Sequence, residues 1–189
     1  TGAITTLSNA LDSIATANSS GGYCGHNDWY LPTVNDLSSL FNANESNSSA
    51  WLIGQGFNNV QFGYWSSTAF LGSDWYIWGA NFFYGVEELV RGTSIRFVWP
   101  VRDVSSSLTM TAPAQVPATG ETGGVAGSNK GVAWPIPRFV SGSGAMADCI
   151  IDKLTGLMWP KNGTIGFVTY GGVLNAYPDY ANRDPSLNV

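Results

Sequence analysis

The chain has 189 residues, of which 44% are hydrophobic and only 11% are charged, and its net charge is −5. This hydrophobic fraction can form the core of one domain, while the polar surface has to consist mainly of Ser, Thr, Asn and Gly, as in secreted bacterial surface proteins. Nucleic acids and anionic lipids are not expected partners, because both bind through clustered Lys and Arg, and the eight such residues here are scattered. No apolar run approaches the roughly 18 residues of a membrane span. The chain begins without a Met, which we expect of a processed or excised piece.

The first part of the chain predicts two helices separated by a polar turn. Residues 5–18 have their apolar side chains on one face, which predicts an amphipathic helix. Further on, Pro32 blocks the continuation of a strand, and Thr33 with Asp36 three residues later approximates a capping box. A second helix is therefore expected from Thr33 to about Phe41.

The next stretch predicts an antiparallel sheet. Residues 42–59 are expected to be loop with a short apolar patch at 51–53. From residue 60 the apolar side chains alternate with a period of two, which indicates strands. The expected strands of this meander over residues 60–102 are 64–68, 75–83, 87–91 and 94–102.

The rest of the chain divides into a linker and a second strand-forming part. Residues 103–130 are rich in Pro, Gly and Ser and predict a linker. Residues 148–152 and 157–159 predict a hairpin that turns at Gly156. Residues 160–189 show no convincing period, so the part after the linker needs a core to pack against.

Residues capable of chemistry are few. Cys24 and Cys149 are the only cysteines; they predict one disulfide in an oxidising compartment, with two buried thiols as the alternative. His26 is the only histidine, and its neighbours Asn27 and Asp28 favour a turn-stabilising hydrogen bond, so neither an enzyme nor a zinc site is expected. No cofactor is expected. Calcium stays open, because Asp, Asn and backbone oxygens suffice as its ligands, although no run matches a calcium-binding loop.

Aromatic residues crowd the predicted meander. Alternation places Trp75 and Ile77 on one face of a strand and Tyr76 and Trp78 on the other. One face has to be core, while the other is available to stack sugars or to pack against a neighbouring unit; packing is the favoured interpretation. The residues of this candidate glycan or interface surface are Trp75, Tyr76, Trp78, Asn81 and Tyr84.

Several short motifs together resemble the bacterial domain family named for the C-terminal region of the Legionella collagen-like adhesin. The motifs are Cys24–Trp29, Leu31–Thr33, Tyr64–Thr68, Val98–Arg102, Gly131–Pro135, Pro137–Phe139 and Asp152–Trp159. The resemblance implies an α+β, C-type-lectin-like fold with two helices and an antiparallel sheet meander, located outside the cell or on its surface. The structural motif residues that it implies are Asp28, Trp29, Leu31, Pro32, Thr33, Trp65, Trp99, Arg102, Gly156 and Trp159.

The motifs stand in a cyclically shifted order. The family's opening half corresponds to residues 116–189 and its closing half to residues 1–102. Three interpretations compete: a tandem array, a head-to-tail polymer, and a permuted domain that closes on itself across the linker. The array or polymer is favoured, because residues 116–120 resemble the lead-in before a family domain. Residues 1–102 are then the C-terminal half of one domain, and residues 131–189 are the N-terminal half of the next, complementing a neighbour.

A repeating head-to-tail interface that does not close produces a filament. We therefore expect a structural subunit or repeat of an extracellular fibre or cell-surface adhesin, with copies of itself as its partner and a disulfide between Cys149 of one unit and Cys24 of the next. The alternative is a discrete glycan-binding lectin module. Tyr30 stands where the family motif has Arg, and the chain is acidic, so anionic glycans are not the expected ligand.

Overall fold

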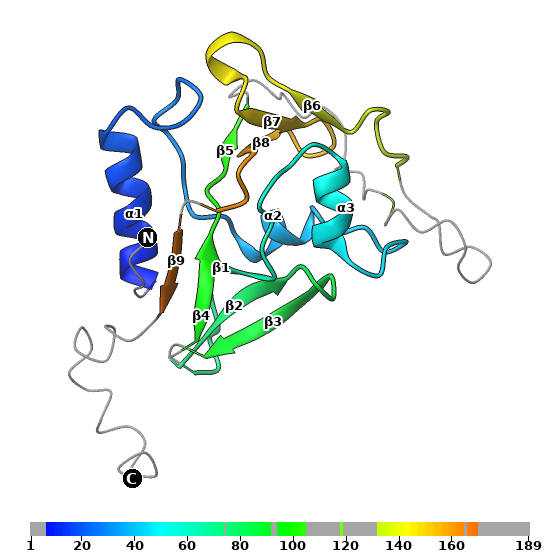
Figure 1. Cartoon of the computed structure of the whole chain (residues 1–189). Helices are drawn as coiled ribbons and strands as arrows, with labels where there is room; N and C mark the ends of the chain where they lie inside the picture. The colour runs from blue at the N-terminus through cyan, green and yellow to red at the C-terminus, as the bar shows by residue number, and fades with distance from the viewer. Residues whose placement is uncertain are drawn as a thin grey trace, which may run out of the picture.

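The computed structural model describes residues 7–73, 75–91, 94–104, 118, 132–164 and 166–169. They form an α+β fold with a five-stranded and a four-stranded sheet (Figure 1). The helices are α1 (Leu7–Ser19), α2 (Val34–Ser38), α3 (Ser48–Gly54) and the 3-10 helix η1 (Gly144–Met146). The strands are β1 (Gly63–Ala69), β2 (Tyr76–Asn81), β3 (Val86–Arg91), β4 (Ile95–Val98), β5 (Arg102–Asp103), β6 (Phe139–Ser141), β7 (Cys149–Asp152), β8 (Leu157–Pro160) and β9 (Gly166–Thr169).

The larger sheet has the strand order β3-β2-β1-β4-β9. Its first three strands form the expected antiparallel meander. The expectation that the last strand continues this meander is wrong, because β4 lies on the other side of β1 and runs parallel to it. β3 carries Glu87, Glu88 and Arg91, charges that are typical of an edge strand. Val98 in β4 is buried, and β4 lies inside the sheet between β1 and β9.

The smaller sheet has the strand order β5-β8-β7-β6 and lies beyond the far end of β4 (Figure 1). β7 and β8 form the hairpin predicted around Gly156, whose φ of 74° suits the turn. β5 follows β4 in the chain and pairs with β8, so the chain passes directly from the larger sheet into the smaller one. Strand β9 follows this sheet in the chain and was not predicted.

The capping box at the start of α2 is present. The Thr33 hydroxyl oxygen accepts from the Asp36 N–H at 3.1 Å, and the Asp36 carboxylate accepts from the Thr33 N–H at 2.8 Å. Helix α2 ends at Ser38, three residues earlier than expected.

The expectation of two helices is wrong, because the described residues include a third α-helix, α3. Asn47 caps it by accepting from the Ala50 N–H at 2.9 Å. The helix has only seven residues, so it is too short to show a helical period in the sequence.

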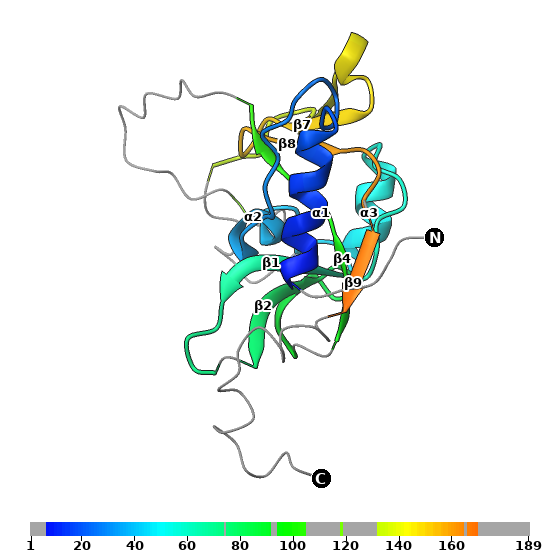
Figure 2. The ribbon, with the colours of Figure 1, turned by 90° about the vertical axis from the view of Figure 1, so that its left-hand side faces the viewer.

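The helices cover opposite faces of the larger sheet. Ala10 and Ile14 of α1 pack with Ile77 and Val90 in one core cluster. Leu37 of α2 belongs to a second cluster with Ala80, which points to the opposite face. Figure 2 shows α1 crossing in front of the sheet. Among the described residues, none of the helices is long and apolar enough to cross a bilayer.

Candidate functional site at the joint between the two halves

The two parts of the chain on either side of residues 105–131 pack against each other in two core clusters; we call their interface the joint. Both core clusters contain residues from each part. The aromatic contacts across the joint are edge-on or tilted, with ring centroids 5.2 to 5.7 Å apart. They join Trp51 to Trp134 and Phe139, Phe57 to Phe139, and Trp99 to Trp159. Within one chain, the joint therefore has the packing of a domain interior.

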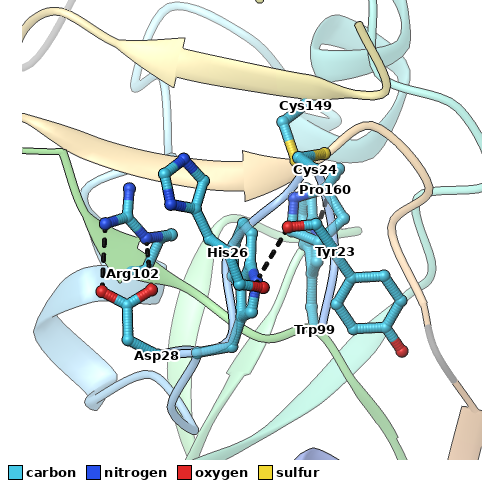
Figure 3. The surroundings of a disulfide bond; sticks show 9 residues. Tyr23, Cys24, His26, Asp28, Trp99, Arg102, Cys149 and Pro160 are labelled. Atoms are coloured by element: carbon cyan, nitrogen blue, oxygen red, sulfur yellow. Dashed lines mark hydrogen bonds and ion pairs between the residues drawn. A yellow bond between two sulfur atoms is a disulfide. The ribbon is translucent and has the colours of Figure 1, made fainter. Parts of the chain in front are cut away.

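A disulfide between Cys24 and Cys149 closes the joint (Figure 3). It ties the turn before Trp29 to the start of β7, as the cyclic order of the motifs predicted. The expected bond between neighbouring units is not what the structure contains, because here both cysteines belong to one chain. Cys149 is completely buried, and Cys24 is partly exposed with a φ of 53°.

A buried ion pair lies deeper in the joint. The Arg138 guanidinium donates to both carboxylate oxygens of Asp152, at 2.9 and 2.6 Å, and to the Ser39 carbonyl at 2.5 Å. The Cζ atom of Arg138 also lies 4.5 Å from the centre of the Trp134 ring. The Asp152 carboxylate further accepts from the Leu154 N–H and the Thr155 hydroxyl. One charge pair thus connects the end of α2, strand β6 and the β7–β8 turn.

Main-chain contacts complete the joint. The Trp99 indole N–H donates to the Pro160 carbonyl at 3.0 Å. The Asn58 N–H donates to the Lys161 carbonyl, and the Gly163 N–H donates back to the Asn58 carbonyl, both at 2.8 Å. A Cβ at Gly163 would lie 2.8 Å from the Cα of Val60, so only glycine allows this approach.

The motif around Trp29 is held by Arg102. Arg102 is 9% exposed, and its guanidinium donates to both Asp28 carboxylate oxygens at 2.7 and 3.0 Å. These hydrogen bonds, and secondarily the positive charge of Arg102, hold the pKa of Asp28 below its ordinary value. Trp29 is 3% exposed and donates its indole N–H to the carbonyls of Tyr23 and His26.

The remaining structural motif residues lie in the core or at element ends. Leu31 and Pro32 are buried, Thr33 is the exposed helix cap, and Trp65, Trp99 and Trp159 are fully buried. Tyr30 pairs through its backbone with Val101. Burial, followed by the negative charges of Asp36 and Asp103, raises the pKa of Tyr30 to about 12.

The candidate glycan or interface residues do not form one exposed platform. Trp75, Tyr76 and Trp78 are half-buried, and Ile77 is buried on the α1 side as the core face. The Asn81 side chain accepts from the N–H groups of Phe83 and Tyr84, so it stabilises the β2–β3 turn. Tyr84 is 69% exposed at that turn.

No functional role was predicted for Arg138 or Asp152, although both stand within motifs that carried the family resemblance. A charged residue between Pro137 and Phe139 in an apolar stretch is a usable signal for a buried ion pair. His26 contributes its backbone to the turn, where its carbonyl and N–H pair with Tyr23. Among the described residues, no cluster of three or more His, Cys, Asp or Glu is placed to hold a metal ion.

Together these features define a small α+β domain whose two halves are joined by a disulfide and a buried ion pair. The family model described as the Lcl C-terminal domain matches residues 1–102, which is more than half of the chain. The chain therefore belongs to the Lcl C-terminal domain family. The comparisons found no matching curated protein and no matching solved structure.

Proposed function

We propose that the chain is a structural subunit or repeat of an extracellular fibre or cell-surface adhesin that assembles head-to-tail through the joint. In the assembly, residues 131–189 of one unit complete residues 1–102 of the next. The family is named for a collagen-like surface protein of Legionella, which supports a bacterial surface location. A disulfide is also typical of an oxidising environment outside the cytosol.

The observation that carries this proposal is the position of the family match. The match ends at residue 102, yet the core that these residues need is completed by residues that come after 131. Ala118 is hydrogen-bonded to Val132 and Trp134, so the connection consists of the 13 residues 105–117, which reach at most about 45 Å when fully extended. A connection of that length allows residues 132–164 to pack on their own chain or on a neighbour.

Both arrangements use the same contacts. Exchanging an identical element between copies keeps every hydrogen bond of the joint, so the equilibrium depends on the linker and on concentration rather than on the interface. When each copy donates to the next without the ring closing, the product is a filament whose units are joined by Cys24–Cys149 bonds.

Two single-cysteine variants discriminate between these arrangements. In Cys24→Ser the second half keeps its thiol, and in Cys149→Ser the first half keeps its own. When the two variants are refolded together under oxidising conditions, complementation between chains allows a Cys149 of one variant to bond to a Cys24 of the other. Peptide mapping of the covalent dimers should then show a Cys149–Cys24 linkage, which neither variant can form when it is refolded alone.

The native material provides the second test. Head-to-tail assembly predicts a disulfide ladder on non-reducing gels and filaments with an axial repeat in electron micrographs. A monodisperse monomer with an internal disulfide, and no mixed dimer from the two variants, would contradict the proposal.

A second candidate is a discrete lectin that binds neutral glycans at the aromatic surface of the β2–β3 hairpin. The observation in its favour is that Tyr76 and Trp78 are partly exposed next to Leu89, which is 41% exposed. A glycan array with the wild type and Trp78→Ala tests it. Hits that the substitution abolishes support the lectin, while hits that persist in Trp78→Ala, or no signal above background, count against it.

A further inference from the structure

Strand β3 forms one edge of the larger sheet. It pairs with β2 on one side, and Figure 1 shows it at the outer margin of the sheet. Among the residues that the structure describes, no strand pairs with its other side. A six-residue edge of this kind presents main-chain N–H and C=O groups that can pair with a further strand.

The register of the sheet shows which residues of β3 direct their main-chain groups outward. The Phe82 N–H donates to the Phe62 carbonyl at 2.8 Å, so the main chain of Phe82 faces away from β3. Main-chain groups of successive residues in a strand point to opposite sides, so Asn81 turns its own groups toward its partner Val86 in β3. By the same alternation, the outward groups of β3 belong to its odd-numbered residues, Glu87, Leu89 and Arg91.

The side chains of the same three residues lie on the face of the sheet that α2 covers, and all three are exposed. Glu87 accepts from the Ser38 hydroxyl of α2 at 2.6 Å. Leu89 is 41% exposed and lies opposite Trp78 of β2. The Arg91 guanidinium has no hydrogen bond or ion pair with any residue that the structure describes. The free edge thus carries a negative, an apolar and a positive side chain in a row.

This row is complementary to a second copy of itself. When two β3 strands align antiparallel about Leu89, Glu87 of each copy lies opposite Arg91 of the other, and the two Leu89 side chains meet in the middle. Each of these pairs can exchange two main-chain hydrogen bonds, because all three residues direct their groups outward. The Arg91 carbonyl accepts from the Ser94 N–H at 2.8 Å, and its second lone pair stays available.

The other antiparallel registers are less favourable. A shift has to keep the side chains on their own faces, so the strand can slip only by an even number of residues. Alignment about Glu88 or about Glu87 places that carboxylate against the same carboxylate of the second copy, which is destabilising. Alignment about Val90 places Arg91 opposite Leu89 and leaves the charge without a partner. The charges of β3 therefore select one register.

The same alignment also joins two apolar surfaces. Trp78 lies beside Leu89, and the Phe70 ring meets the Trp78 ring edge-on, with the ring centroids 6.0 Å apart. Contact between the two Leu89 side chains connects these surfaces into one apolar stripe across both copies.

We propose that β3 is a surface through which two copies of this chain associate edge to edge, with their two five-stranded sheets joined into one. The contact is non-covalent and uses no residue of the joint, so the dimer does not depend on head-to-tail assembly. One strand edge buries less surface than a stable interface, and we therefore expect a weak dimer. In the filament proposed above, the same pairing would connect neighbouring filaments side by side.

The test uses the full chain with its internal Cys24–Cys149 bond, isolated as the fraction that non-reducing electrophoresis shows to be monomeric. The covalent bond prevents exchange of halves in this material, so a dimer has to use another surface. Sedimentation velocity should show a dimer whose fraction rises over about 0.01–1 mM protein. Hydrogen exchange by NMR should show that the amide protons of Glu87, Leu89 and Arg91 become protected only at concentrations where the dimer forms.

A charge exchange identifies the register. Arg91→Glu and Glu87→Arg should each raise the Kd of the dimer about 10-fold or more, because like charges then oppose each other at both ends of the pair. An equimolar mixture of these two variants should dimerise again, since glutamate opposes arginine at both ends of the mixed pair. The matched changes Glu45→Arg and Lys153→Glu, at exposed positions outside β3, should leave the Kd unchanged.

The edge-to-edge dimer is overturned if the chain stays monomeric over the whole concentration range, or if the dimer forms without protection of the three outward amide protons. It is also overturned if both charge reversals leave the Kd unchanged, or if both weaken the dimer and their mixture does not restore it. The hydrogen-exchange result comes from the wild type and does not depend on the folding of any variant. Head-to-tail assembly is judged separately, from Cys149–Cys24 linkages between chains.

Discussion

The joint and the β2–β3 hairpin both contain aromatic residues and an ion pair, but they differ in how far these groups are exposed to solvent. At the joint, Trp99, Trp159 and the Arg138–Asp152 pair are almost completely removed from water. At the hairpin, Phe83 and Tyr84 are 50% and 69% exposed, and the Arg96–Glu88 pair is partly open to solvent. The difference predicts that the stability of this domain depends more on the attachment of its second half than on the hairpin surface.

Removing the buried carboxylate of Asp152 should lower the stability of the domain more than any other change considered. Asp152→Ala leaves the Arg138 charge buried without its partner, which costs about 3–5 kcal/mol of unfolding free energy. Glu88→Ala, the matched change at the hairpin, should cost about 1 kcal/mol or less. Urea unfolding of both variants measures the contrast, and equal losses would show that the joint is not the stabilising region.

Removing the disulfide should have the next largest effect. The bond connects positions 125 residues apart, so the double variant Cys24→Ser, Cys149→Ser should lose about 2–4 kcal/mol. The wild type under reducing conditions should match this variant. Unfolding curves that do not change with reductant would exclude a role of the bond in holding the halves together.

Gly163→Ala tests the close approach at the joint without removing any group. The added methyl would lie 2.8 Å from Val60 Cα, and overpacking of this kind costs about 1–3 kcal/mol. Gly54→Ala is the control, because a Cβ there meets nothing within 4 Å. It should be neutral or slightly stabilising, since alanine favours helices. Two equally tolerated substitutions would show that the 58–60 loop can move away.

The last prediction is a small loss of stability at acid pH, caused by the protonation of Asp28. The pKa of Asp28 is lower in the folded protein than its ordinary value of 3.8, so the unfolded state binds more protons in this range. The Asp28–Arg102 contribution is therefore present above pH 3.8 and is lost as the pH falls through the folded pKa. Asp28→Asn should be less stable than the wild type at pH 7, and the two should converge at acid pH, once Asp28 is protonated in the folded protein as well. A difference that stays constant with pH would show that the charge on Asp28 is not involved.

Short sequence patterns correctly predicted the elements whose formation depends only on residues close together in the sequence. Thr33 and Asp36 are three positions apart, and the capping box that they form needs nothing beyond that turn. The β7–β8 hairpin likewise follows from two apolar runs around Gly156. Family order also predicted that the second half packs against the first, although the sequence pattern alone could not say in which chain.

Features set by distant residues were not predictable in this way. β4 lies between β1 and β9, and its place in the sheet depends on both neighbours. The sequence of a four-residue strand does not reveal which strands will flank it. An open pocket beside the disulfide brings together Tyr23, Asn58 and Asp148, which lie 35 and 90 positions apart in the sequence and share no motif. Only the three-dimensional closure of the joint makes them neighbours.

The disulfide also determines how the chain would respond to being pulled from its two ends. Because Cys24 and Cys149 are covalently linked, tension passes through the sulfur atoms and bypasses the 124 residues from 25 to 148. Those residues would otherwise lengthen the chain by up to about 430 Å when drawn out. In an oxidising environment pulling can therefore draw out only the residues outside this loop, 1–23 and 150–189, and reduction would release the loop as well.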